Sequence, residues 1–188
     1  MANRDVQSRF PNTIIPRGLT MWMTAACRVT AGAAIFILGP IALGIAQNGP
    51  GELERITGGT VPCIDGRAGI FECRNVDLVS FLPVHELGGS PGIGTNDVWG
   101  WTDKENDRDY AIVGLHDRTS FVDVTDVNKP IWLGSLDRTE NTRRTLWRDI
   151  KVYGNFAYIV SDSSGRHGVQ VFNLAELRAF AGTPIRFE

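Results

Sequence analysis

Residues 97–136 read DVWGWTDKENDRDYAIVGLHDRTSFVDVTDVNKPIWLGSL, and their pattern recurs in residues 149–188. Four apolar segments keep the same order in both stretches, and their spacing drifts only where the turns between them differ in length. One supersecondary unit copied along a chain has this appearance, and four short strands in about 50 residues are typical of a β-propeller blade. The repeat therefore predicts two blade-like units. The alternative is two unrelated hairpins of similar composition.

Each unit is expected to form a four-stranded antiparallel meander. Its segments are too short and too rich in β-branched residues to be helices. One helical turn is expected between the third and fourth strands of the second unit, at residues 175–180, where AELRAF favours helix. Equivalent positions should be buried in both units: Val98, Ile112 and Phe121 in the first, and Ile150, Tyr158 and Val171 in the second.

The composition agrees with an all-β globular chain. Apolar residues make up 43% and charged residues 21% of the 188, and the formal net charge is −2. This balance lacks the excess of basic residues that holds a nucleic-acid backbone, so we expect no nucleic-acid partner. The predicted fold is all-β, a partial β-propeller with about two four-stranded antiparallel blades and an extra N-terminal strand.

Residues 1–46 differ in character from the rest of the chain. No charge occurs between Arg28 and Glu52, and residues 29–46 are apolar over 18 residues. That length is short for a membrane-spanning helix, which needs about 20 apolar residues, and the stretch ends in the small residues typical of a secretory cleavage site. We expect a signal peptide removed near Gln47, with a retained N-terminal anchor as the alternative.

The remaining chain divides into a connector and the repeat region. Residues 47–62 are rich in Gly and Pro and lack apolar periodicity, which predicts an exposed connector. Residues 63–188 are assigned to the incomplete propeller, with units at about 97–136 and 149–188. The extra strand is expected within residues 75–82, NVDLVSFL, whose apolar residues match those of a fourth strand.

Two cysteines remain once Cys27 leaves with the leader. Cys63 and Cys73 form an even pair in an oxidising compartment, which predicts a disulfide. So short a ring contributes about 2–3 kcal/mol of stability in the chain-entropy description. The competing interpretation is a metal-binding pair, but no second Cys pair or nearby histidine completes four ligands.

Two further stretches suggest binding chemistry. Trp99 and Trp101 share one face of a strand and could form a sugar-stacking platform, but packing against a neighbouring blade is the preferred interpretation. The acidic residues of 103–109 alternate as in a calcium loop. That stretch lacks the glycine and glutamate required at the sixth and twelfth positions, so a solvated hairpin turn is expected.

Two histidines form the one pattern that could become a site. His116 and His167 both fall between the second and third strands of their units, and Asp117 and Asp162 share those loops. Histidines at matching positions could line one mouth of a propeller and bind a metal or act as a base. Without a third partner the pair is weak support for a site, and we expect solvated loop residues, no catalytic residues and no cofactor.

Longer segments carry a resemblance to a known family. They are VDLVSFLP, NDVWGWTD, YAIVGLHDRTSFVDVTD, WRDIKVY and HGVQVFNLAELR, found in this order between Cys63 and Phe187. In these segments the chain resembles the N-terminal part of the choice-of-anchor B family, whose members carry LVIVD-type repeats. The resemblance implies an exported bacterial β-propeller, secreted or anchored at the cell surface, and carries over no catalytic residue.

The functional expectations follow from this resemblance. We expect an extracytoplasmic, non-catalytic module that binds a surface protein or glycan, with membrane contact only through residues 1–46 or a C-terminal anchor. The alternative is a secreted propeller hydrolase or metalloenzyme whose site is completed by further blades. Because the sequence stops at Glu188 within the second unit, we also expect a fragment with an open sheet edge and an uncovered blade face.

Overall fold

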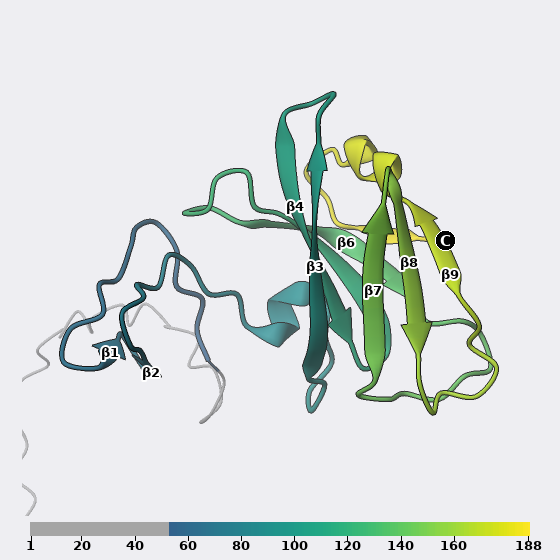
Figure 1. Cartoon of the computed structure of the whole chain (residues 1–188), viewed down its shortest axis with the longest axis horizontal. Helices are drawn as coiled ribbons and strands as arrows, with labels where there is room; N and C mark the ends of the chain where they lie inside the picture. Colours follow the sequence, from purple (N-terminus) through teal and green to yellow (C-terminus); the bar gives the residue numbers. More distant parts are fainter. Residues whose placement is uncertain (1–52) are drawn as a thin grey trace, which may run out of the picture. The chain divides into compact units, whose positions relative to one another are not determined.

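The computed structural model describes residues 53–188, which form an all-β structure of ten strands and two short 3-10 helices (Figure 1). The predicted leader, its cleavage site and the first residues of the connector lie outside the described residues. The all-β prediction is confirmed for the part of the chain that is described.

The first repeat unit forms a four-stranded antiparallel meander, as predicted. Its strands pair with their chain neighbours in order: β3 (Thr95–Asp103), β4 (Arg108–Leu115), β5 (Arg118–Asp123) and β6 (Ile131–Asp137). Polar residues make the tight turn between β3 and β4, where Asp107 adopts a φ of 52°. The expected hairpin turn at 103–109 is therefore present.

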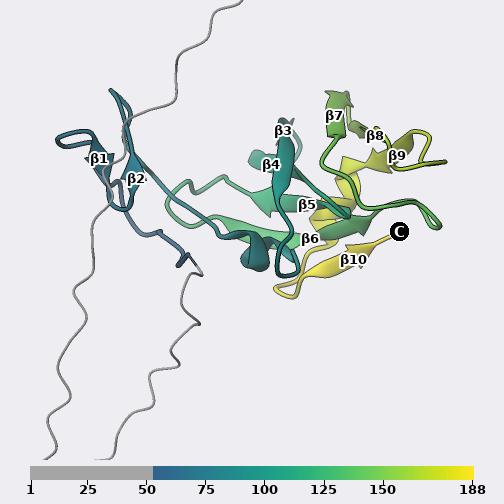
Figure 2. The same ribbon diagram turned by 90° about the horizontal axis from the view of Figure 1, so that it is seen from below.

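The second unit contains three paired strands, which corrects the prediction of a second four-stranded blade. They are β7 (Arg148–Tyr153), β8 (Phe156–Ser161) and β9 (Gln170–Asn173). The predicted fourth strand exists as β10 (Ile185–Phe187), but it pairs in parallel with β6 of the first sheet (Figure 2). The helix η2 (Leu174–Ala179) lies between β9 and β10, where a helical turn was expected, and the Asn173 side chain caps its start.

Gly134 explains why β10 can pair with β6 of the first sheet. It lies in β6 with a φ of 142°, and a Cβ built there would stand 1.9 Å from the carbonyl oxygen of Ile185. The absence of a side chain thus permits the close approach of β10. Phe187 then stacks edge-on against Phe121 and Phe172, with ring centroids 5.5 Å and 5.2 Å away.

The apolar core lies between the inner faces of the two sheets. Strand alternation places one set of side chains inward from each sheet, and the loss of their apolar surface to water is the main stabilising contribution. The core residues are Trp101, Tyr110, Ile112, Phe121, Leu133, Leu136, Ile150, Ala157, Ile159, Phe172, Leu174, Leu177 and Phe187.

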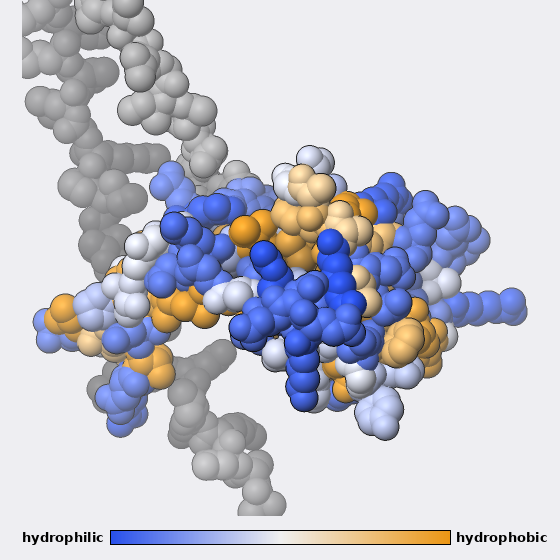
Figure 3. All heavy atoms as spheres, turned by 90° about the horizontal axis from the view of Figure 1, so that it is seen from above, coloured by the Kyte–Doolittle hydropathy of each residue, from blue (hydrophilic) through white to orange (hydrophobic). Residues whose placement is uncertain are grey.

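Three of the six positions predicted to be buried are exposed instead. Ile112, Phe121 and Ile150 lie in the core, whereas Val98, Tyr158 and Val171 face outward. The strand register shows that the six positions fall on both faces of the sheets, because Val98 lies beside Val113 whereas Ile112 lies beside Trp99. Residues 53–188 cover only the inner face of each sheet with the other sheet. Apolar residues consequently reach the surface among hydrophilic ones, as the face drawn in Figure 3 shows.

The segment before β3 carries little regular structure. It contains the two-residue strands β1 (Arg67–Ala68) and β2 (Phe71–Glu72) and the 3-10 helix η1 (Val84–Leu87). The predicted extra strand at 75–82 is absent, because only isolated bridges form there, from Leu78 to Val61 and from Phe81 to Ile56. These bridges join the connector to residues 78–81 through Ile56 and Val61, while most of residues 53–62 are exposed as predicted.

Candidate functional site

Three loops meet at one end of the two sheets. They are the β4–β5 turn at 116–117, the β6–β7 loop at 138–147 and the β8–β9 loop at 162–169. The backbone N–H of Arg143 donates to the carbonyl of Ser164 at 2.8 Å, and that of Thr145 donates to the carbonyl of His116 at 3.1 Å. The middle loop is thus fixed to both of its neighbours. We call these loops and the side chains directly beneath them the three-loop end.

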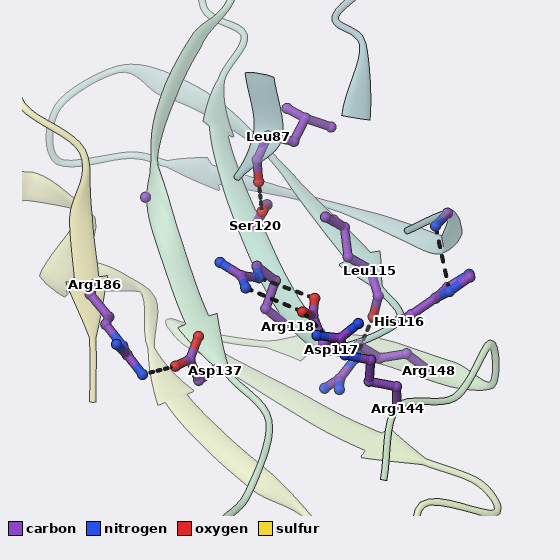
Figure 4. Close-up of polar contacts among 12 residues, drawn as sticks. Leu87, Leu115, His116, Asp117, Arg118, Ser120, Asp137, Arg144, Arg148 and Arg186 are labelled. Atoms are coloured by element: carbon purple, nitrogen blue, oxygen red, sulfur yellow. Dashed lines mark hydrogen bonds and ion pairs between the residues drawn. The ribbon is translucent and has the colours of Figure 1, made fainter. Parts of the chain in front are cut away.

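Arg148 lies beneath the loops and is 1% exposed. As the first residue of β7 it shares the inward strand face with Ile150. Its Nε donates to the Leu115 carbonyl at 3.0 Å (Figure 4). Its Nη1 lies 3.4 Å from Nε2 of His167. Burial lowers the pKa of Arg148 to about 10, an effect that the charge of Asp117 opposes. The guanidinium therefore stays charged at neutral pH.

His167 is buried against this guanidinium and is 5% exposed. Its Nδ1 lies 3.1 Å from the carbonyl of Gly168 and can donate to it, which leaves Nε2 to accept from Arg148. Burial lowers the pKa of His167; the bond to Gly168 opposes this shift and the positive charge of Arg148 adds to it. The geometry favours a neutral imidazole with a structural role.

His116 and Asp117 occupy the turn between β4 and β5. Nδ1 of the half-buried His116 accepts the N–H of Gly94 at 3.5 Å. The buried Asp117 carboxylate accepts two bonds from Arg118, at 3.1 and 3.2 Å, and lies 3.9 Å from Nε of Arg144 (Figure 4). Burial by itself would raise the pKa of Asp117, but the two arginines outweigh it and the pKa is lowered.

The loop positions predicted for His116 and His167 are confirmed, but the expectation that both are solvated is wrong. The β6–β7 loop covers them, because Thr139 Oγ1 donates to the His167 carbonyl at 3.0 Å and Thr145 bonds to the carbonyl of His116. Within residues 53–188, no group of three or more His, Cys, Asp or Glu side chains is arranged to hold a metal ion. Asp162 is exposed and contributes its backbone to the loop contacts.

The outer side of the β6–β7 loop presents apolar and cationic side chains to solvent. Leu146 is half-exposed, Trp147 is 60% exposed, and most of the Arg144 side chain is accessible. The backbone of Trp147 is nevertheless fixed, since its carbonyl accepts the N–H of Asp162 at 2.7 Å and its N–H donates to Thr145 Oγ1 at 3.2 Å. A large exposed ring on an ordered backbone is suited to binding, because little conformational entropy is lost on contact.

The other residues considered for binding in the sequence make contacts with neighbouring side chains. Trp101 is buried in the core and stacks on Tyr110 of its own unit, with ring centroids 5.2 Å apart. Trp99 is partly exposed, and Nζ of Lys151 lies 4.6 Å from its ring centroid. Asp103, at the start of the acidic turn, is buried and accepts two bonds of 2.7 Å from Arg178 of η2.

Cys63 and Cys73 lie at disulfide distance, as predicted. Their Sγ atoms are 1.97 Å apart and their Cα atoms 5.9 Å apart. The bridge closes the β1–β2 hairpin region and is the kind of crosslink found in proteins of oxidising compartments.

Arg148 is the central residue that the sequence interpretation missed. A usable signal existed, because Arg148 lies two residues before Ile150 and so falls on the strand face predicted to be buried. A charged residue at such a position indicates a buried polar network.

No family model, curated protein or solved structure matches this chain. Among residues 53–188, none of the helices is long and apolar enough to cross a membrane.

Proposed function

We propose that this chain is an extracytoplasmic module of β-propeller type that binds a surface protein or glycan through its three-loop end and has no catalytic role. The observation that carries the proposal is the contrast at that end. On the inner side, buried Arg148 bonds to the Leu115 carbonyl and contacts His167, whereas Arg144, Leu146 and Trp147 on the outer side face solvent.

The propeller architecture and the kinship with the choice-of-anchor B family belong to this proposal. They are supported by the repeat of residues 97–136 in 149–188, by the antiparallel meander of the first unit and by the face-to-face packing of two small sheets. Such packing of successive four-stranded units is how propellers are built.

Location outside the cytoplasm is supported by Cys63 and Cys73 and by the apolar stretch at 29–46. A bonded cysteine pair persists in secreted and surface proteins and is rare where glutathione keeps thiols reduced. The proposal expects the exported chain to carry this disulfide, which intact-mass measurement before and after reduction detects.

Binding is tested with the full chain on an array of immobilised bacterial surface glycans and surface proteins. Trp147→Ala is expected to lower the affinity for any bound component by about tenfold or more, since exposed tryptophans on ordered loops are frequent binding hot spots. Trp99→Ala is the matched control, because Trp99 is an exposed tryptophan on β3, outside the three loops. Equal loss in both variants, or no bound component at all, would overturn the proposal.

A further inference from the structure

The outer face of the β7–β8–β9 sheet carries apolar and aromatic side chains at the surface. The strand register places Tyr153 beside Phe156, and Tyr158 beside Val171. All four are exposed; Tyr153, the most accessible, is 82% exposed. In a β-strand a polar residue is expected on a face that meets only water.

The sequence repeat shows what such a face packs against elsewhere in the same chain. The four outer residues are equivalent to Trp101, Tyr110, Ile112 and Phe121 of the first unit. Those residues lie in the core, where Ile150, Ala157, Ile159 and Phe172 of the second sheet cover them. One chemical type of face is therefore buried in the first sheet and exposed in the second.

Part of the covering half of this interface is present a second time. Ile150, Ala157 and Ile159 are equivalent to Val98, Ala111 and Val113 on the outer face of the first sheet, whereas Val122, the equivalent of Phe172 on that face, is buried. Val98 is 60% exposed, whereas Ile150 is fully buried, and Ala111 and Val113 are half-buried. The helix η1 contacts β5 and β6 of this sheet, while these three residues lie on β3 and β4.

We infer that the outer face of the β7–β8–β9 sheet binds a second copy of this chain, which docks through Val98, Ala111 and Val113 of its first sheet. Within one chain, the first and second sheets formed by residues 95–188 pack against each other. The proposed contact would form the same kind of packing between two chains. Because the two surfaces differ, the association is head-to-tail, and successive copies form a ring or an open chain. This inference rests on the repeat and is independent of the proposed ligand-binding function.

Two variants separate the two halves of the contact. Tyr158→Asp places a charge on the receiving face, and Val98→Asp places one on the docking face. Both residues are exposed, so each variant should stay folded, which circular dichroism and the urea midpoint verify. Val171→Asp is a second variant of the receiving face. Val127→Asp is the control, since Val127 is an equally exposed valine in the β5–β6 loop.

Sedimentation velocity over a wide range of concentration is the readout. The unchanged chain and Val127→Asp should form species larger than a monomer as concentration rises, whereas Tyr158→Asp and Val98→Asp should each remain monomeric. Mixing those two variants leaves one intact surface of each kind and should give a one-to-one dimer. A chain that is monomeric throughout, assembly that both variants leave unchanged, or assembly lost with Tyr158→Asp alone would overturn the inference.

Discussion

Arg148 is the side chain on which the three-loop end depends. It is almost fully buried, bonds to the Leu115 carbonyl and contacts His167. The unsatisfied carbonyl and the cavity left by truncation both cost stability, so Arg148→Ala should lower the free energy of unfolding by about 2–5 kcal/mol. Urea unfolding measures this loss. Arg166→Ala, at an exposed arginine of the β8–β9 loop, should change it by no more than about 0.5 kcal/mol. Similar values for the two variants would contradict the structural role of Arg148.

His167 should make stability depend on pH. Its pKa in the folded chain is lowered by burial, while in the unfolded chain it is about 6.5. Between those two pKa values the unfolded state binds more protons. The stability that neutral His167 contributes to the folded chain is therefore fully present above about pH 6.5. It is lost as the pH falls toward the pKa of His167 in the folded chain.

The test is the urea unfolding midpoint, measured at about pH 8 and at about pH 5.5. These two values lie above and below the pKa of His167 in the unfolded chain. The wild-type chain should lose stability between them, and His167→Gln, which cannot titrate, should lose less. An identical pH dependence in the two proteins would show that His167 is protonated equally in the folded and unfolded states.

At the scale of elements, Gly134 governs where β10 pairs. Gly134→Ala should destabilise the chain by at least about 1–3 kcal/mol, because the new methyl group meets the Ile185 backbone at 1.9 Å and must push β10 away. Gly100→Ala is the matched control in β3, since the nearest atom to its Cβ is 3.9 Å away.

Unfolding by urea gives the two stabilities, and limited proteolysis reports on release of the C-terminal strand. Cleavage between η2 and β10 should become faster in Gly134→Ala and stay unchanged in Gly100→Ala. If both substitutions are tolerated alike, the parallel pairing of β10 with β6 does not depend on the absence of a side chain at Gly134.

Local pattern predicted the elements well and their partners less well. The meander of the first unit follows from alternation and turn chemistry, which are properties of neighbouring residues. The partner of β10 depends on a close approach between Gly134 and Ile185, which are 51 positions apart in the sequence. Tyr158 and Val171 were expected to be buried because the repeat makes them equivalent to Ile112 and Phe121. A sheet covering their face is not among residues 53–188.

In the candidate site, too, local features could be predicted from the sequence and long-range contacts could not. The loop positions of His116 and His167 were predictable, because they depend only on the order of strands. Their burial was not, since it results from the β6–β7 loop closing over both through its bonds to distant carbonyls.

At the scale of the whole molecule, we expect the two histidines to have a structural role and not to form a metal centre. His167 contacts Arg148, and His116 accepts from the Gly94 backbone. A positively charged guanidinium beside His167 also disfavours a bound cation. Among residues 53–188, the surfaces proposed to act in binding are therefore the outer side of the three-loop end and the exposed sheet faces.

Titration of the full chain with zinc by isothermal calorimetry is the most direct test of this central claim. We predict no stoichiometric binding to the wild-type chain at neutral pH. Stoichiometric, sub-micromolar binding that disappears in the double variant His116→Ala/His167→Ala would contradict the account and support a metalloenzyme.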